Sequence, residues 1–101
     1  MIQKKTIIDL IEITRNGVLQ IRFGLLLMED GVELASQWHR TVVEPGGDVD
    51  RQLDAVNAHL QSMNKAQIET AGIPRLRQIV ALVHDPETVA KYRANQLENQ
   101  L

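Results

Sequence analysis

The chain has 101 residues, of which 44% are hydrophobic, 3% aromatic and 24% charged, and its formal net charge is −2. This length and composition suit a single globular domain, residues 1–101, with a mainly aliphatic core. Basic and acidic residues are spread almost evenly along the chain, so no basic arm indicates binding by phosphate neutralisation. The lack of cysteine excludes disulfides, thiolate zinc sites and thiol catalysis.

A hairpin is predicted around the first Asn-Gly pair, which lies between two apolar runs. Both residue types tolerate positive φ, so this pair is a strong hairpin signal. A three-residue loop at 15–17 places Ile13 opposite Leu19 and Ile11 opposite Ile21. A two-residue loop would place a glutamate beside an isoleucine, and a one-residue slip sends a whole apolar set to the wrong face. The three-residue loop is therefore predicted.

A second hairpin is predicted at Asp30-Gly31, again between two apolar runs. A tight turn there places Phe23 opposite Trp38 and Leu19 opposite Val42. Shifting the register by one residue would mate these apolar side chains with polar ones, so the tight register is predicted. Residues 1–44 then form a three-stranded β-meander.

These two registers give one sheet face that carries most of the large apolar side chains. A patch of this size must be covered, because a three-stranded sheet gains stability mainly by packing against other elements. The predicted core half consists of Ile7, Ile11, Ile13, Leu19, Ile21, Phe23, Leu25, Leu27, Leu34, Trp38 and Val42.

Helices are predicted over residues 48–97. The Glu44-Pro45-Gly46-Gly47 stretch ends the sheet, because proline cannot donate to a ladder and paired glycines favour a change of direction. Asp48 is a suitable N-cap for a first helix, whose apolar residues recur at spacings of four and three. Ile73-Pro74 and Asp85-Pro86 indicate two further helix starts, and the last helix is expected to fray from residue 96. The predicted fold class is α+β, with strand order 1-2-3 and two or three helices packed on one sheet face.

No residue pattern indicates catalysis, a cofactor or a metal. His39, His59 and His84 fall on three different predicted elements and lack the spacing of metal ligands. The acidic residues around Asp48 are explained by helix capping and the helix dipole, and they lack the spacing of a calcium loop. We therefore expect no catalytic residue, no cofactor, no metal and no enzymatic activity.

The second sheet face is also partly apolar, although a free meander would make that face more polar. Either one helix covers each face, or the second face meets another chain, and open edge strands offer the same opportunity. Association is the favoured alternative. The candidate partner surface consists of Ile8, Leu10, Arg22, Leu26, Met28 and His39.

Several short stretches of the chain together carry a resemblance to known proteins. They are Trp38-His39-Arg40, Glu44-Pro45-Gly46, the Val-Asn-Ala-His-Leu run at 56–60, and Pro86 followed by Val-Ala-Lys-Tyr-Arg at 89–93. In this order they resemble small proteins of unassigned function that tailed bacteriophages encode among their virion genes. The resemblance covers most of the chain but includes no functional signature, so no site residue is carried over. It implies a virion-associated or accessory role.

The expected function is a non-enzymatic structural or interaction module of a phage virion or tail, acting as a homo-oligomer or bound to other virion proteins. The alternative is a small nucleic-acid-binding or host-directed regulatory protein. Burial of a sheet face or edge between subunits would favour the first, and one surface gathering Arg22, Arg40, Arg75 and Arg77 would favour the second. Since no signal-peptide core or long apolar run is found, we expect a product of the host cytoplasm or the virion, with no membrane contact.

Overall fold

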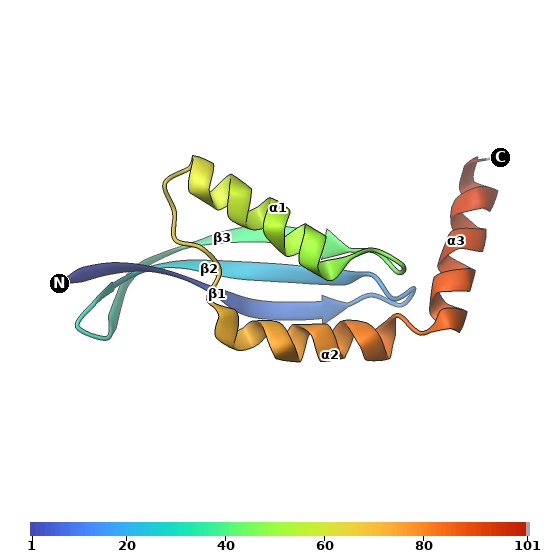
Figure 1. Ribbon diagram of the computed structural model, residues 1–101, viewed down its shortest axis with the longest axis horizontal. Helices are drawn as coiled ribbons and strands as arrows, with labels where there is room; N and C mark the ends of the chain where they lie inside the picture. The colour runs from blue at the N-terminus through green and yellow to red at the C-terminus, as the bar shows by residue number, and fades with distance from the viewer. Residues whose placement is uncertain (101) are drawn as a thin grey trace.

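The computed structural model describes residues 1–100 and shows a three-stranded antiparallel sheet followed by three α-helices, which confirms the predicted α+β class (Figure 1). The strands pair in the order β1-β2-β3. They are β1 (Ile2–Ile13), β2 (Leu19–Glu29) and β3 (Val32–Val43). The helical elements are α1 (Val49–Ser62), a short 3-10 turn η1 (Thr70–Gly72), α2 (Ile73–Val83) and α3 (Pro86–Gln100).

The first hairpin has the predicted three-residue loop. The Thr14 backbone N–H donates to the Val18 carbonyl oxygen at 2.9 Å, and Gly17 has a φ of +90°, a conformation that favours glycine. Next to this turn Ile11 lies opposite Ile21, as predicted.

A β-bulge then changes the pairing of β1. The register shifts between Ile8 and Leu10, so Ile8 lies opposite Phe23 and Ile7 lies opposite Gly24. Because a bulge inserts one extra residue, every side chain beyond it moves to the other face. Ile8 therefore faces the helices, and Ile7 faces the opposite side of the sheet.

The second hairpin also begins as predicted, with a tight turn in which Asp30 and Gly31 have φ values of 52° and 82°. A second register shift follows between Leu27 and Met28. Phe23 consequently pairs with His39, and the predicted pairing of Phe23 with Trp38 is wrong. The turn sets the register only as far as the first bulge.

The second bulge moves several predicted core residues to the other face or into solvent. Trp38 is 52% exposed, and Leu34 and Val42 are 51% and 46% exposed. Ile13, which is 53% exposed, is the last residue of β1, on the edge of the sheet. The prediction was correct for Leu19, Ile21 and Phe23. The buried core cluster consists of Leu19, Ile21, Phe23, Val43, Leu53, Val56, Leu60, Ile68 and Leu76.

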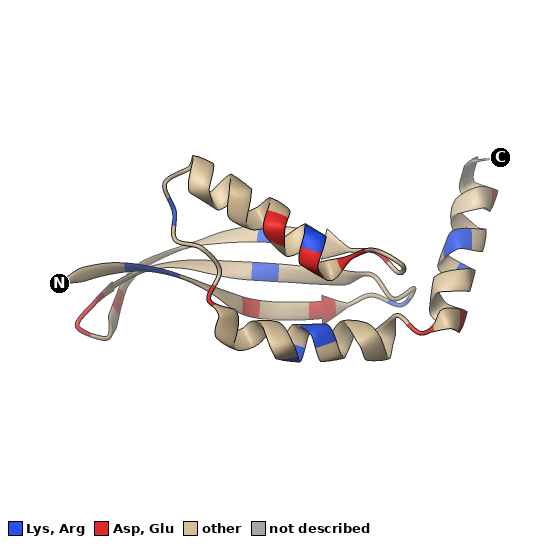
Figure 2. Ribbon diagram, viewed as in Figure 1, with Lys and Arg blue, Asp and Glu red and all other residues tan. Residues whose placement is uncertain are grey.

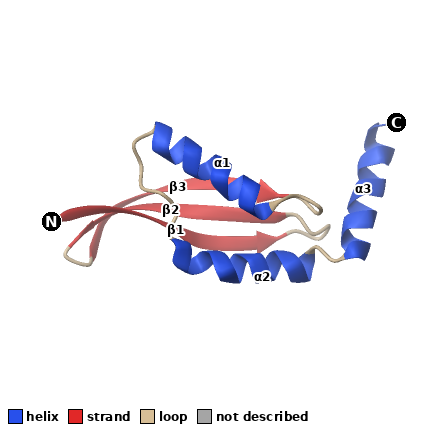
Figure 3. Cartoon of the chain, viewed as in Figure 1, coloured by secondary structure: helices blue, strands red, loops and turns tan. Residues whose placement is uncertain are grey.

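Helices α1 and α2 both pack on the same sheet face, which we call the helix side (Figure 3). Their buried residues, Leu60 of α1 and Leu76 of α2, belong to one cluster with the side chains of β2. The third helix lies at one end of the sheet (Figure 1), against the loop that follows β3. Its Arg93 and Val89 side chains surround Gly46 of that loop. Helix α3 continues to Gln100, beyond the predicted helical end at residue 97, and Leu101 lies outside the described residues.

The segment before η1 runs along the outer edge of β1. The Glu69 backbone N–H donates to the Thr6 carbonyl oxygen at 2.8 Å, and Thr6 forms a parallel bridge with Ile68. The Thr6 hydroxyl donates to the Ala66 carbonyl oxygen at 2.7 Å and is almost fully buried. This contact covers the middle of one sheet edge.

Candidate functional site: an open sheet face

The sheet face opposite the helix side is not covered by any described element, and we call it the open face. Its position follows from the register and from contacts among its side chains. Its large apolar residues are Ile7, Leu10, Leu26, Met28, Trp38 and Val42. Its charged residues are Lys5, Asp9, Glu12, Arg22, Glu33 and Arg40.

Trp38 lies at the centre of the open face, beside the one glycine of β2. A Cβ atom at Gly24 would lie 3.3 Å from the Trp38 ring and 3.4 Å from Ile7. The glycine therefore leaves room for the indole to lie across β2, while half of the Trp38 surface stays exposed. The Arg22 guanidinium carbon lies 4.4 Å from the ring centroid, which is cation–π geometry.

The charges of the open face balance each other. The bulge in β1 places Asp9 beside Arg22, whose Nε and Nη2 atoms donate to the Asp9 Oδ2 atom at 2.8 and 2.6 Å. Both side chains of this pair are only about one-quarter exposed, so water screens the pair less than it screens a fully exposed one. The whole face carries three basic and three acidic side chains. It has no excess of positive charge that would attract phosphates.

The four arginines that would favour a nucleic-acid-binding protein do not form one surface. Arg22 and Arg40 lie directly opposite each other on the open face. Arg75 and Arg77 lie on α2, on the helix side, and Arg77 is paired with an acidic residue of α1. Figure 2 shows Lys and Arg distributed over strands and helices.

The predicted partner surface is partly brought together. Leu10, Arg22, Leu26 and Met28 lie on the open face, whereas Ile8 and His39 face the helices because of the two bulges. Sequence reasoning missed Ile7, Trp38 and Val42 as members of the open face.

A signal for the first bulge was present in the sequence. The pairs Ile7-Ile8 and Leu10-Ile11 flank Asp9, so the apolar residues do not keep the period of two that an unbroken strand would show. No comparable signal marks the second bulge.

His39 and His59 make a structural contact between the sheet and α1. Their rings stack with centroids 5.2 Å apart, and the His39 ring lies 6.3 Å from that of Phe23. Burial lowers the pKa of His39, and the neighbouring His59 lowers that pKa further. The neutral form of His39 is therefore favoured at this contact.

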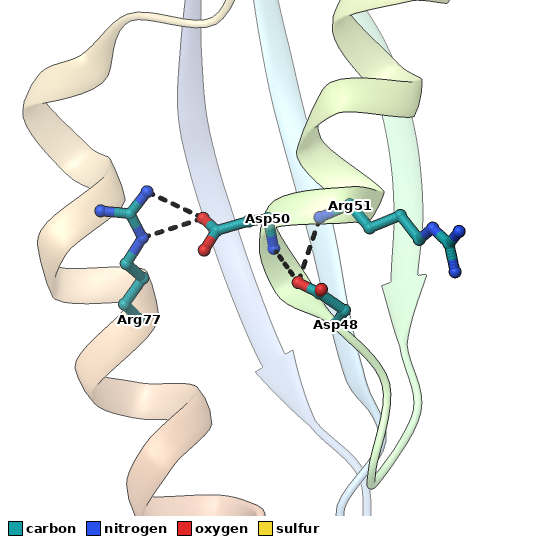
Figure 4. Close-up of polar contacts among 4 residues, drawn as sticks. All are labelled: Asp48, Asp50, Arg51 and Arg77. Atoms are coloured by element: carbon teal, nitrogen blue, oxygen red, sulfur yellow. Dashed lines mark hydrogen bonds and ion pairs between the residues drawn. The ribbon is translucent and has the colours of Figure 1, made fainter.

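The acidic residues at the start of α1 cap and anchor the helix, as predicted for Asp48 (Figure 4). The Asp48 carboxylate accepts from the backbone N–H groups of Asp50 and Arg51 at 3.0 and 3.2 Å. The Arg77 Nη2 atom lies 2.8 Å from the Asp50 Oδ1 atom, and this ion pair links α1 to α2. These contacts use the carboxylates for structure.

His84 connects the end of α2 to the first hairpin turn. Its Nε2 atom lies 2.7 Å from the Gly17 carbonyl oxygen, so Nε2 carries the proton, because a carbonyl only accepts. This contact holds the loop between α2 and α3 against the sheet end.

A second surface feature lies where the hairpin end of the sheet extends past the helices. A hollow there has an apolar floor that includes Leu25, Leu27 and Ala35, and Lys4 and Lys65 lie at its rim. Lys4 donates to a backbone carbonyl of the loop after α1, at 3.2 Å. The buried polar side chain of its lining, Thr6, already donates its hydroxyl to the Ala66 carbonyl oxygen, so it is not free to orient a small ligand.

Within residues 1–100, no helix is long and apolar enough to cross a membrane. No protein-family model matches the chain, and neither the curated proteins nor the solved structures contain a significant match.

Proposed function

We propose that this chain is a non-enzymatic interaction module that binds another protein through its open face, and that it serves in a bacteriophage virion or tail. The observation that carries the first part is the half-exposed Trp38 at the centre of an uncovered sheet face. The second part rests on the resemblance to small phage proteins. The partner is another copy of the chain or a different virion protein.

The chemistry of the open face suits a protein partner. Tryptophan and arginine are the residues most enriched at the energetic centres of protein interfaces, and here Arg22 lies over the ring of Trp38. Trp38 is surrounded by aliphatic side chains with charged residues among them. Contiguous apolar patches of several hundred square ångströms on a protein surface mark interaction sites.

The open face is also large enough to form a protein–protein interface. Three strands spaced about 4.8 Å apart, each about 11 residues long at about 3.3 Å per residue, give a face of roughly 500 Å². A specific interface buries about 800 Å² of accessible surface on each partner, and a minimal one about 500 Å². The open face alone therefore reaches the lower end of this range.

A single-stranded nucleic acid is the second candidate ligand, because an exposed aromatic ring on an antiparallel sheet can stack with a base. Trp38 with Arg22 and Arg40 beside it favours this candidate. Against it, Asp9 neutralises Arg22, and the acidic residues Glu12 and Glu33 lie on the same face. We therefore favour the protein partner.

The single tryptophan gives a direct test, since Trp38 reports only on the open face. If the partner is another copy, Trp38 emission shifts to shorter wavelength as concentration rises into the micromolar range, and light scattering shows a mass above 11.4 kDa. Leu26→Glu places a charge on the face and should abolish both changes. Leu82→Glu on α2, where the side chain is already 80% exposed, is the matched control and should preserve them.

Two other outcomes separate the remaining candidates. Binding of a purified virion protein that Leu26→Glu abolishes, while the chain alone stays a monomer, supports a different protein partner. Salt-sensitive quenching of Trp38 by single-stranded DNA or RNA, without any protein association, would refute the protein-binding proposal.

A further inference from the structure

We infer that two copies of this chain pair through their sheet arms, with the acidic tip of each arm seated in the basic hollow of the other. The sheet arm consists of residues 2–5 and 26–36, the part of the sheet that extends past the helices (Figure 1). The inference goes beyond the proposed function, because it uses the helix side of the arm and leaves Trp38 on the open face free to bind another protein.

The sheet arm lacks the helix layer that covers the rest of the helix side. That layer ends at the loop of residues 64–66, where the Ala66 carbonyl oxygen accepts from the buried Thr6 hydroxyl. Beyond this loop, Ile2 and Val32 both pair with Glu29, which places them on the helix side. They are nevertheless 59% and 60% exposed. The arm therefore presents an uncovered apolar face.

The hollow at the base of the arm is basic. It has a volume of about 160 Å³, and its lining includes Lys4, Lys5 and Lys65 but no acidic residue. The Lys5 Nζ atom lies 3.7 Å from the Glu69 Oε1 atom, whereas among the described residues Lys4 and Lys65 belong to no ion pair. With its apolar floor, the hollow suits an apolar side chain flanked by carboxylates.

The tip of the same arm has this chemistry. Residues 28–34 include Glu29, Asp30 and Glu33 and no basic residue. Glu29 lies opposite the exposed Val32, so a carboxylate and an apolar side chain share the helix side at the tip. Asp30 lies 3.5 Å from the N-terminal ammonium, but both groups are more than 80% exposed, and such an ion pair contributes little.

The dimensions of the layers allow two arms to overlap without a clash. A helix with its side chains is about 10 to 12 Å thick, and stacked sheets lie about 10 Å apart, so a second arm fits where the helix layer is absent. From Thr6 to the turn the arm spans about five residues, or roughly 17 Å. In an antiparallel overlap, each tip advances until it meets the other copy's loop of residues 64–66. This loop sets the overlap and keeps the two helix layers apart.

Charge and symmetry favour a second copy as the occupant. Because one arm carries both the acidic tip and the basic hollow, a two-fold axis satisfies both contacts at once and closes the assembly at two copies. The apolar faces supply the attraction, and the charges fix the orientation. The overlapping area, three strands wide and about 17 Å long, is roughly 240 Å², which corresponds to a weak, reversible dimer.

An exchange of charge between two variants tests this pairing. The tip variant, Glu29→Lys with Asp30→Asn, makes the tip basic and keeps a residue that tolerates positive φ at the turn. The hollow variant, Lys4→Glu with Lys65→Glu, makes the hollow acidic. Each variant alone should dimerise at least about tenfold more weakly than the unaltered chain, because like charges meet. An equimolar mixture should regain the dimer, since both contacts of the mixed pair join opposite charges.

Sedimentation equilibrium measures these differences, with a limiting mass of twice 11.4 kDa for the arm dimer. Glu98→Lys is the matched control, because it reverses an exposed charge on α3, which lies at the opposite end of the sheet (Figure 1). It should leave dimerisation unchanged. Circular dichroism and thermal unfolding of each variant verify its fold.

NMR of the unaltered chain gives a measurement that needs no variant. As the protein concentration rises toward about 1 mM, a range suited to a weak dimer, the amide shifts of Leu27, Ala35 and Lys65 should change together. The indole N–H of Trp38 reports separately on the open face. If a charge variant fails to fold, these shifts still decide the inference.

The outcomes separate this inference from the proposed function. Arm shifts that stay constant, or a mixture no more associated than its separate variants, overturn arm pairing, whereas binding of a protein at Trp38 would still support the proposed function. Conversely, restored association in the mixture supports arm pairing even if the open face binds no protein.

Discussion

The stacked imidazoles of His39 and His59 join the middle of β3 to the last turns of α1, with ring centroids 5.2 Å apart. Neither residue has a catalytic partner in the described structure. Their contact makes the attachment of α1 to the sheet sensitive to protonation, because two charged rings at this distance repel each other.

The first prediction is a loss of stability in mild acid. The folded-state pKa of His39 lies below its ordinary value of 6.5, so below about pH 6.5 the unfolded chain binds more protons than the folded chain. The stability is therefore complete above this pH and decreases as the pH falls through it. Urea unfolding between pH 8 and 5 measures the effect.

His59→Gln is the matched variant for this prediction. It removes the neighbouring charge that lowers the pKa of His39, so the stability should change less with pH between 7 and 5. An equal pH dependence in both proteins would show that the stacked pair is not its source.

The second prediction contrasts the two large aromatic residues of the sheet. Phe23 is fully buried, so Phe23→Ala should cost about 3 to 5 kcal/mol in the free energy of unfolding. Trp38 is half exposed on the open face, so Trp38→Ala should cost about 1 kcal/mol or less in dilute protein. Equal losses in equilibrium unfolding would contradict the observed register.

The third prediction concerns two turn glycines with similar φ angles. Gly17 and Gly31 have φ values of 90° and 82°, so alanine at either site should cost about 1 to 2 kcal/mol from backbone strain. A Cβ atom at Gly17 would also lie 2.6 Å from a Thr88 methyl group, whereas one at Gly31 meets nothing within 4 Å. Gly17→Ala should therefore be the more destabilising by about 1 to 3 kcal/mol in thermal or urea unfolding.

The fourth prediction concerns the buried hydroxyl of Thr6. It donates to the Ala66 carbonyl oxygen, so Thr6→Val leaves that oxygen without its partner and should cost about 1 to 3 kcal/mol. Thr6→Ser keeps the hydroxyl and should cost less. Chemical denaturation of both variants provides the measurement, and a Thr6→Val protein as stable as Thr6→Ser would show that the hydrogen bond contributes little.

Local chemistry in the sequence was sufficient to predict the elements of this fold. Asn16-Gly17 and Asp30-Gly31 specified two turns, and Asp48 specified the start of α1, because their preferences depend on backbone conformation within a few residues. The strand order followed from the turns, and the apolar spacing of residues 49–60 predicted the helix face that packs on the sheet.

The tertiary structure decided which side chains each sheet face carries. Two bulges, at Asp9 and Leu34, each move one residue out of the ladder. The bulge at Asp9 places Ile7 on the open face, and the bulge at Leu34 places Trp38 on the open face and His39 beneath α1. The apolar pairs around Asp9 marked the first bulge in the sequence, but no local pattern marked the second, whose position depends on how the whole sheet packs against α1 and α2. Because side chains alternate with a period of two, one inserted residue exchanges the faces of all that follow, and this exchange created the candidate site.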